Sequence, residues 1–244
     1  MEPDGAKAFD FRLSTLDSFA VLYLVATPIG NLADITLRAL ETLRAVDLIA
    51  AEDTRHSQIL LRHHGITGKP LLSFHEHNEA RRTAELIERM KAGESVAVMT
   101  DAGLPGISDP GLRLVQACQR EGLPFTILPG ASAPALALVG SGFDPGDGFF
   151  FGGFLPNKSG GREREVRRAL ERDILSLFFE SPHRLQRTLD LIALLEPARE
   201  VCVARELTKH FEEYRRGPAV EVAAHYKAHP PKGEIVLVVS ATTD

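Results

Sequence analysis

The chain has 244 residues, of which 44% are hydrophobic and 25% are charged, with a formal net charge of -5. This composition is typical of a globular protein with a core of normal size, in one large domain or two small ones. A net negative charge argues against general nucleic-acid binding, so contact with phosphates would need a locally basic surface. No run approaches the roughly 20 apolar residues that span a bilayer. We therefore expect a cytoplasmic protein without membrane segments.

Two further features support a cytoplasmic location. Cys118 and Cys202 lack the spacing of a disulfide framework or a zinc site, which favours two buried free thiols. Residues 1–19 lack the basic and apolar regions of a signal peptide, and we expect a flexible N-terminal extension there.

From Val21 onward, short apolar runs alternate with amphipathic stretches. The apolar runs predict strands over residues 21–29, 47–53, 70–76, 95–103 and 124–130. The amphipathic stretches predict helices over residues 31–46, 57–65, 78–93, 110–122 and 132–142. Uniformly apolar strands indicate a parallel sheet that is covered by helices on both faces. The fold class is therefore α/β.

The second half of the chain has a different pattern. Apolar runs predict strands over residues 149–156, 174–182, 201–207, 212–222 and 233–240. A polar loop over 157–165 leads into a basic helix over 165–173, and a second helix covers 184–196. No long helix is predicted among the last three strands, so this sheet should be mixed or antiparallel. We place an N-terminal α/β domain at 20–128 and a C-terminal α/β domain at 129–244.

A glycine-rich turn, MTDAGLPGISDPG, covers residues 99–111 between a predicted strand and a helix. Ligands of open α/β sheets bind at the carboxyl ends of the strands, and glycines allow close approach of the backbone. Asp101 and Asp109 would accept hydrogen bonds from such a ligand. Alternatively, this is an ordinary turn in which Asp109 caps the next helix. Neither a Walker A loop nor a GxGxxG fingerprint is present, so a nucleotide-like cofactor would bind differently.

Ser132 lies in LPGASAPALAL, again between a strand and a helix. The Gly130-x-Ser132 sequence resembles the start of a nucleophile elbow, but position 134 is Pro where that motif has Gly. A serine hydrolase is one alternative. The simpler interpretation is that Ser132 caps the helix and Pro134 opens it.

The segments AEDTRHS and SFHEHNE place several polar residues just after predicted strands, at the same sheet edge as the glycine-rich turn. Asp53 and His75 are candidates for acid–base chemistry. Asp53 and Asn78 could instead be solvated helix caps. A metal bound by His75 and His77 lacks a third ligand at recognisable spacing, so we predict no metal site.

Basic residues concentrate on the helix predicted over 165–173 and the loop before it. Arg164, Arg167 and Arg168 stand at i, i+3 and i+4, where they could follow phosphates. Neighbouring glutamates partly neutralise this surface, so a solvated helix face is the alternative.

Taken in order, one set of segments resembles the bacterial 16S rRNA (cytidine-2′-O)-methyltransferases, a family of the tetrapyrrole methylase superfamily. The segments are LVATPIGNLADIT, AEDTR, FHEHNE, DAGLPGISDPG, PGASA, GFLPNK, ESPHRL, ARELTKHFEE and KGEIVLVV. They extend from about Val21 to Val239.

The resemblance implies two α/β domains of the tetrapyrrole methylase type, with S-adenosylmethionine in the interdomain cleft, and a homodimer. It also implies that the substrate is 16S rRNA in the small ribosomal subunit, methylated at the ribose of a cytidine in the decoding region. The residues it assigns to the cofactor are Thr27, Pro28, Asp101, Ala102, Gly103, Ile107, Ser132, Ala133, Ala204, Lys232 and Gly233.

We assign catalysis and substrate binding partly from the resemblance and partly from charge. Asp53 or His75 would act as the base. The residues assigned to the RNA are Arg55, Asn78, Arg164 and Arg168.

The chain departs from the superfamily pattern at two positions. Its first loop reads ATPIGN where enzymes that act on tetrapyrroles have GxGPG, which argues against a tetrapyrrole-like small molecule, the main alternative substrate. The usual DAGTP reads DAGLP, so Leu104 offers no hydroxyl to a ligand.

Overall fold

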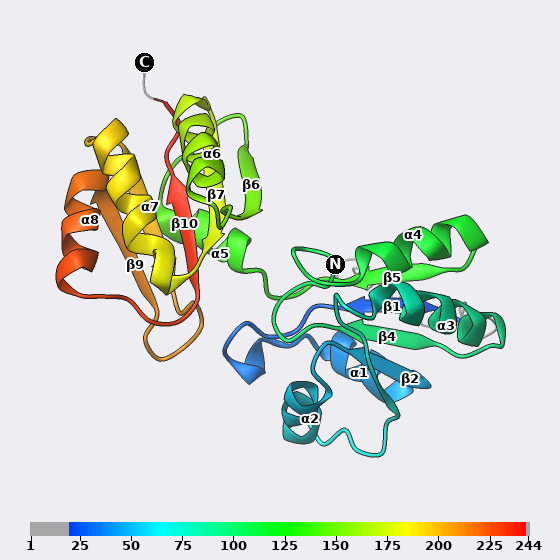
Figure 1. The fold of residues 1–244 in the computed structure, drawn as a ribbon. Helices are drawn as coiled ribbons and strands as arrows, with labels where there is room; N and C mark the ends of the chain where they lie inside the picture. Colours follow the sequence, from blue (N-terminus) through cyan, green and yellow to red (C-terminus); the bar gives the residue numbers. More distant parts are fainter. Residues whose placement is uncertain (1–19, 243–244) are drawn as a thin grey trace, which may run out of the picture. The chain divides into compact units, whose positions relative to one another are not determined.

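The computed structural model describes residues 20–242, so the extension predicted over residues 1–19 lies outside the described residues. The chain divides into two compact units, each built around its own sheet (Figure 1). Within the described residues, the first unit consists of 20–25, 36–101 and 109–129. The second consists of residues 26–35, 102–108 and 130–244, of which those up to 242 are described. The second unit thus includes two short segments from the first half of the chain.

The first unit contains a parallel five-stranded sheet in the order β3-β2-β4-β1-β5, as the apolar runs predicted. Its strands are β1 (Leu22–Val25), β2 (Leu48–Ala51), β3 (Leu71–Ser73), β4 (Val96–Met99) and β5 (Phe125–Leu128). Every residue of β1, β2 and β4, the three inner strands, is buried. Because all five strands run the same way, the loops that follow them start from one edge of the sheet.

The helices of the first unit are α1 (Leu37–Ala45), α2 (Thr54–His63), α3 (Glu79–Lys91) and α4 (Leu112–Glu121). Helices α3 and α4 contribute Leu86, Met90 and Leu114 to a core cluster with Leu22 and Leu24 of β1. The helix predicted over 31–46 is divided into a 3-10 turn, η2 (Leu32–Asp34), and α1. The break occurs because Thr36 is extended and its side chain caps α1.

The second unit contains a mixed five-stranded sheet in the order β6-β7-β10-β8-β9, as predicted. Its strands are β6 (Phe149–Phe154), β7 (Leu175–Glu180), β8 (Glu200–Arg205), β9 (Glu213–Pro218) and β10 (Ile235–Val239). Strands β6 and β7 are parallel, and the remaining pairs are antiparallel. The helices are α5 (Ala133–Ser141), α6 (Ser159–Glu171), α7 (Pro182–Leu195) and α8 (Ala219–Ala228).

Helix α8 corrects the sequence prediction, which had a strand over 212–222 and no long helix in this region. Strand β9 ends at Pro218, and a ten-residue helix follows. Its buried residues, Ala219, Val222, Ala223 and Tyr226, recur at helical spacing and join the core of the unit. The short sequence VEV at residues 220–222 alternates like a strand, but it lies in the first turn of this helix.

Helix α6 begins earlier than predicted. It starts at Ser159, inside the stretch expected to be a polar loop. Arg162, Val166, Ala169 and Leu170 form its buried face, and this packing outweighs the low helix propensity of Gly160 and Gly161. Among the helices of the described region, none is long and apolar enough to cross a membrane.

A buried ion pair connects β7 to α7 in the second unit. The Glu180 side chain is fully buried, and its carboxylate lies 2.7 Å from Nη2 of Arg184. Its other oxygen accepts a hydrogen bond of 2.8 Å from the hydroxyl of Thr188. Arg184 also donates to the carbonyl of Leu155 and to the side chain of Asn157, at the loop that follows β6.

Replacing Arg184 with Met should lower the free energy of unfolding by about 3–5 kcal/mol, because it leaves a buried carboxylate without its charge partner. Urea denaturation would measure the loss. The control is Arg167→Met, since Arg167 and Glu163 form a pair of 2.7 Å whose side chains are 52% and 47% exposed. That change should cost at most about 1 kcal/mol. Equal losses in the two variants would contradict the prediction.

Candidate functional site

Two backbone hydrogen bonds join the loop over residues 102–108 to the segment after β1. The amide of Thr27 donates to the carbonyl of Gly103 at 2.8 Å, and the amide of Gly103 donates back to the carbonyl of Thr27 at 3.1 Å. Gly103 has a φ of 81°, a conformation that favours glycine. Ser108 also lies in the left-handed region, with a φ of 65°. Backbone strain of this kind concentrates at functional sites, which makes the loop a candidate for ligand contact.

One apolar cluster of the second unit gathers predicted cofactor residues from separate parts of the chain. Ala204 is fully buried in it, and Ala102 and Ala133 pack against it as partly buried residues. Ile29, which follows Thr27 and Pro28, belongs to the same cluster. Thus, three alanines that are 31 or more positions apart in the sequence belong to one apolar cluster. Lys232 and Gly233 are exposed and lie outside the cluster.

The start of α5 leaves backbone groups open to a ligand. Ser132 is its N-cap residue, but the Ser132 side chain accepts no bond from the helix, contrary to the capping interpretation. Pro134 opens the helix as that interpretation predicted. A Cβ at Gly130 would lie 2.7 Å from Cβ of Ala26, so only glycine allows these two segments to approach. The amides at a helix N-terminus suit a carboxylate or a ribose hydroxyl, and the alanine side chains offer an apolar surface to an adenosine. These residues therefore fit S-adenosylmethionine.

The carboxylates of Glu52, Asp101 and Asp109 lie near one another in the first unit. The amide of Asp53 donates to Asp101 at 3.2 Å, and the amide of Asp101 donates to Glu52 at 3.3 Å, which ties the end of β2 to the end of β4. Burial and the charges of Glu52 and Asp101 raise the pKa of Asp109 to about 6. Burial also raises the pKa of Glu52. Asp109 does not cap α4, whose N-cap is Gly111.

Glu52 and Asp109 are absent from the predicted catalytic residues, although they occur in the motifs AEDTRHS and MTDAGLPGISDPG. The sequence does not show that they are close in space, because they are far apart along the chain. A pair of half-buried carboxyl groups with raised pKa values is a typical feature of functional sites.

Asp53 is an N-cap with a charged partner. Its carboxylate accepts from the amide of Arg55 at 2.9 Å and lies 2.7 Å from Nη2 of the same residue. The hydrogen bonds from Arg55 hold the pKa of Asp53 well below its usual range. A carboxylate held in its charged form is a weak proton acceptor. The Arg55 side chain is 88% exposed, so it remains open to a further anion.

His75 and Asn78 form one hydrogen-bonded unit after β3. Asn78 accepts from the amide of His75 at 2.9 Å and donates to the carbonyl of Ser73 at 3.2 Å. These two bonds fix the orientation of its amide, whose nitrogen lies 3.1 Å from Nε2 of His75. Nε2 therefore accepts and Nδ1 carries the proton. Nδ1 is buried without a hydrogen-bond partner in the region the structure describes.

The basic surface of α6 is mostly paired within the helix. Arg167 binds Glu163 at 2.7 Å, and Arg168 approaches Glu165 at 3.4 Å. Arg164 is exposed and makes no ion pair within residues 20–242.

Two alternative chemistries gain no support from the geometry. Across the described part of the chain, Ser132 makes no hydrogen bond with a histidine, which a serine nucleophile would need. Within the same residues, no three His, Cys, Asp or Glu side chains are grouped as a metal site would require.

Comparison with known proteins identifies a family. The family described as Tetrapyrrole (Corrin/Porphyrin) Methylases matches residues 21–223. A protein of Synechocystis named ribosomal RNA small subunit methyltransferase I is 47% identical over 224 residues, covering 91% of this chain and 80% of its own. A protein of the same name from Thermotoga maritima is 48% identical over 219 residues, covering 90% of this chain and 97% of its own.

Solved structures share the fold at low sequence identity. A diphthine synthase has a TM-score of 0.69 and 19% identity, covering 92% of this chain and 91% of its own. Uroporphyrin-III-C-methyltransferase from Thermus thermophilus has a TM-score of 0.63 and 22% identity, covering 91% and 94%.

Replacing Asp109 with Asn should remove a pH dependence of stability. The pKa of Asp109 is raised to about 6 in the folded protein. Protonated Asp109 therefore contributes to the free energy of unfolding fully below about pH 4, and this contribution is lost as the pH rises through 6. Between these limits, the unchanged protein should lose about 1–2 kcal/mol relative to Asp109→Asn, with allowance for partial exposure. Urea denaturation at several pH values would measure this. Exposed Asp144→Asn is the control, and equal pH profiles for all three proteins would contradict the assignment.

Proposed function

The chain belongs to the tetrapyrrole methylase family and is a methyltransferase, and on this basis we propose that it methylates 16S ribosomal RNA. The proposed acceptor is the ribose 2′-hydroxyl of a cytidine in the decoding region of the small subunit, and the donor is S-adenosylmethionine. The pinned loop over 102–108, clustered with Ala133 and Ala204, is the observation that carries the proposal. The names of the relatives support the RNA as substrate. We further propose a cytoplasmic homodimer.

The cofactor would be held mainly by the second unit. Its adenosine would lie against the small side chains of Ala102 and Ala133, and its polar groups would meet the turn at Thr27 and the amides of α5. When bound, it supplies an electrophilic methyl group that needs no metal ion. Asp101, which precedes Ala102 directly, offers a carboxylate to hydroxyl or ammonium groups.

The protein residues would orient the acceptor and remove its proton. Holding the hydroxyl oxygen in line with the transferred methyl group is worth roughly 7–11 kcal/mol in favourable cases. A base adds about 10²–10⁴-fold. We propose His75 as that base in preference to Asp53, whose carboxylate is occupied by Arg55. To take a proton on Nε2, His75 would release the bond from Asn78, so Asn78 would position the ring in the free enzyme.

Positive charge for the RNA would come from a few exposed arginines. Arg55 and Arg164 are the strongest candidates, because Arg55 is 88% exposed and Arg164 is exposed without an ion pair in the described residues. Arg168 would first have to leave Glu165. A few phosphate contacts suit a protein with an overall negative charge that reads an unstacked nucleotide in a folded particle.

The purified protein should transfer a labelled methyl group from S-adenosylmethionine to small ribosomal subunits that lack its modification. Nuclease digestion and mass spectrometry should then identify 2′-O-methylcytidine. Deproteinised 16S rRNA and assembled subunits would be compared as substrates. Methylation of a base, or of a tetrapyrrole in place of RNA, would contradict the proposal.

His75→Ala should lower the single-turnover rate on subunits by about 10²–10⁴-fold, because it removes the base. Asp53→Asn should lower it less than tenfold, because it mainly weakens the cap of α2 and the pairing with Arg55. Rapid-quench assays with saturating cofactor would measure both rates. A larger loss in Asp53→Asn than in His75→Ala would reverse the assignment.

A further inference from the structure

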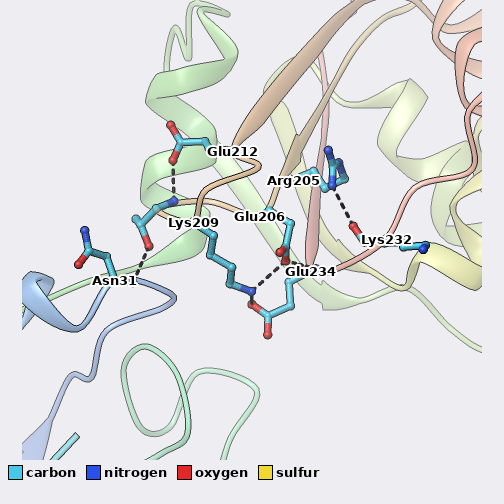
Figure 2. Close-up of polar contacts among 8 residues, drawn as sticks. Asn31, Arg205, Glu206, Lys209, Glu212, Lys232 and Glu234 are labelled. Carbon is cyan, nitrogen blue, oxygen red and sulfur yellow. Dashed lines mark hydrogen bonds and ion pairs between the residues drawn. The ribbon is translucent and has the colours of Figure 1, made fainter. Parts of the chain in front are cut away.

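The loop over residues 206–212, from the ARELTKHFEE motif, is held in a strained conformation. Glu206 and Thr208 lie in the left-handed region, with φ of 51° and 66°. The amide of Lys209 donates to the carbonyl of Glu206. The amide of Thr208 donates to the Glu212 carboxylate at 2.6 Å (Figure 2). Non-glycine residues keep such conformations only where surrounding contacts fix them.

Lys209 connects this loop to the turn before β10. Its Nζ lies 2.9 Å from Oε1 of Glu206 and 3.1 Å from Oε2 of Glu234 (Figure 2). Oε1 of Glu206 also accepts from the amide of Glu234 at 3.0 Å. Burial acts to lower the pKa of Lys209, but its hydrogen bonds with Glu206 and Glu234 outweigh this and raise it. The ammonium group is therefore held charged, and it bridges two carboxylates.

The same loop also holds the segment after β1. The hydroxyl of Thr208 accepts from the amide of Asn31 at 3.2 Å (Figure 2). The stem of Lys209 covers Gly30, where a Cβ would lie 2.4 Å from Cγ of Lys209. Glycine is also required at 233, where φ is 86° and a Cβ would lie 2.2 Å from Oε1 of Glu206. Both contacts leave no space for a side chain.

We infer that Lys209 is a positioning residue for the methyl-donor site, and this inference rests on the proposed function. Lys209 holds two segments that carry predicted cofactor residues, one containing Thr27 and Pro28 and the other Lys232 and Gly233. The first of these segments is in turn pinned to the loop over 102–108 through Gly103. Lys209 itself belongs to none of the predicted cofactor contacts. It acts by fixing the spacing of the two segments that carry those contacts.

The variant Lys209→Met tests this role, because it keeps a stem to cover Gly30 and removes the charge that bridges the carboxylates. We expect the Kd for S-adenosylhomocysteine, measured by calorimetry, and the KM for S-adenosylmethionine to rise about tenfold. The KM for the RNA and the kcat at saturating cofactor should change less than twofold. Lys209→Arg, which keeps the charge, should restore most of the affinity.

Lys91→Met is the matched control. Lys91 bridges two carboxylates in the same way, at 3.1 Å from Glu88 and 3.0 Å from Glu121, in the first unit. It should leave the Kd unchanged, because it removes a doubly paired lysine that touches neither of the two segments. If Lys209→Met does not fold, Glu234→Gln carries the test, since Glu234 is 72% exposed and its loss should raise the Kd about threefold.

An unchanged Kd in Lys209→Met, or equal effects in Lys91→Met, would overturn the positioning role while leaving the proposed function intact. A fall in kcat without a change in cofactor KM would also overturn it. If the unchanged protein binds neither S-adenosylmethionine nor S-adenosylhomocysteine, the proposed function itself fails, and the inference fails with it.

Discussion

The two backbone hydrogen bonds between Thr27 and Gly103 are the constraint on which the candidate site depends. Strands β1 and β4 are neighbours in the parallel sheet, so the segments that follow them, 26–35 and 102–108, start side by side. Both segments belong to the second unit, and the paired amides and carbonyls join them there. The joint requires Gly103, because its left-handed backbone turns the loop so that both of its polar groups meet Thr27.

Much of the fold could be predicted because buried strands and helix faces produce regular patterns of apolar residues in a sequence. Inner strands such as β2 and β4 are covered on both faces, so they appear as uninterrupted apolar runs. The start of α6 and the presence of α8 were harder to predict, because packing against the rest of the second unit determines both. The start of α6 contains two glycines, and the start of α8 alternates like a strand over three residues. In both cases the buried helical face, which only the partner elements define, prevailed over local propensity.

The sequence indicated which residues gather at the candidate site but not what they do to one another. Placing polar residues after parallel strands correctly brought Asp53 and Asp101 together. It could not show that Arg55 neutralises Asp53, because exposed arginines have many possible partners. It also could not show that Asp109 lies close enough to Glu52 and Asp101 for its pKa to rise, since that depends on a fold-determined distance. Electrostatic roles follow from separation and burial, and neither is encoded locally.

The backbone of the loop over 102–108 is set without the side chain of Leu104. The conformation of residues 102–108 depends on left-handed backbone at Gly103, Gly106 and Ser108, and on the bond from the amide of Ile107 to the carbonyl of Leu104. None of these features uses the side chain at position 104. A hydroxyl lost there leaves the backbone groups in place, so recognition of a cofactor through the main chain would tolerate the leucine. Glycine is required at positions 30 and 130 for a different reason, because a Cβ there would lie 2.4 Å from Cγ of Lys209 and 2.7 Å from Cβ of Ala26.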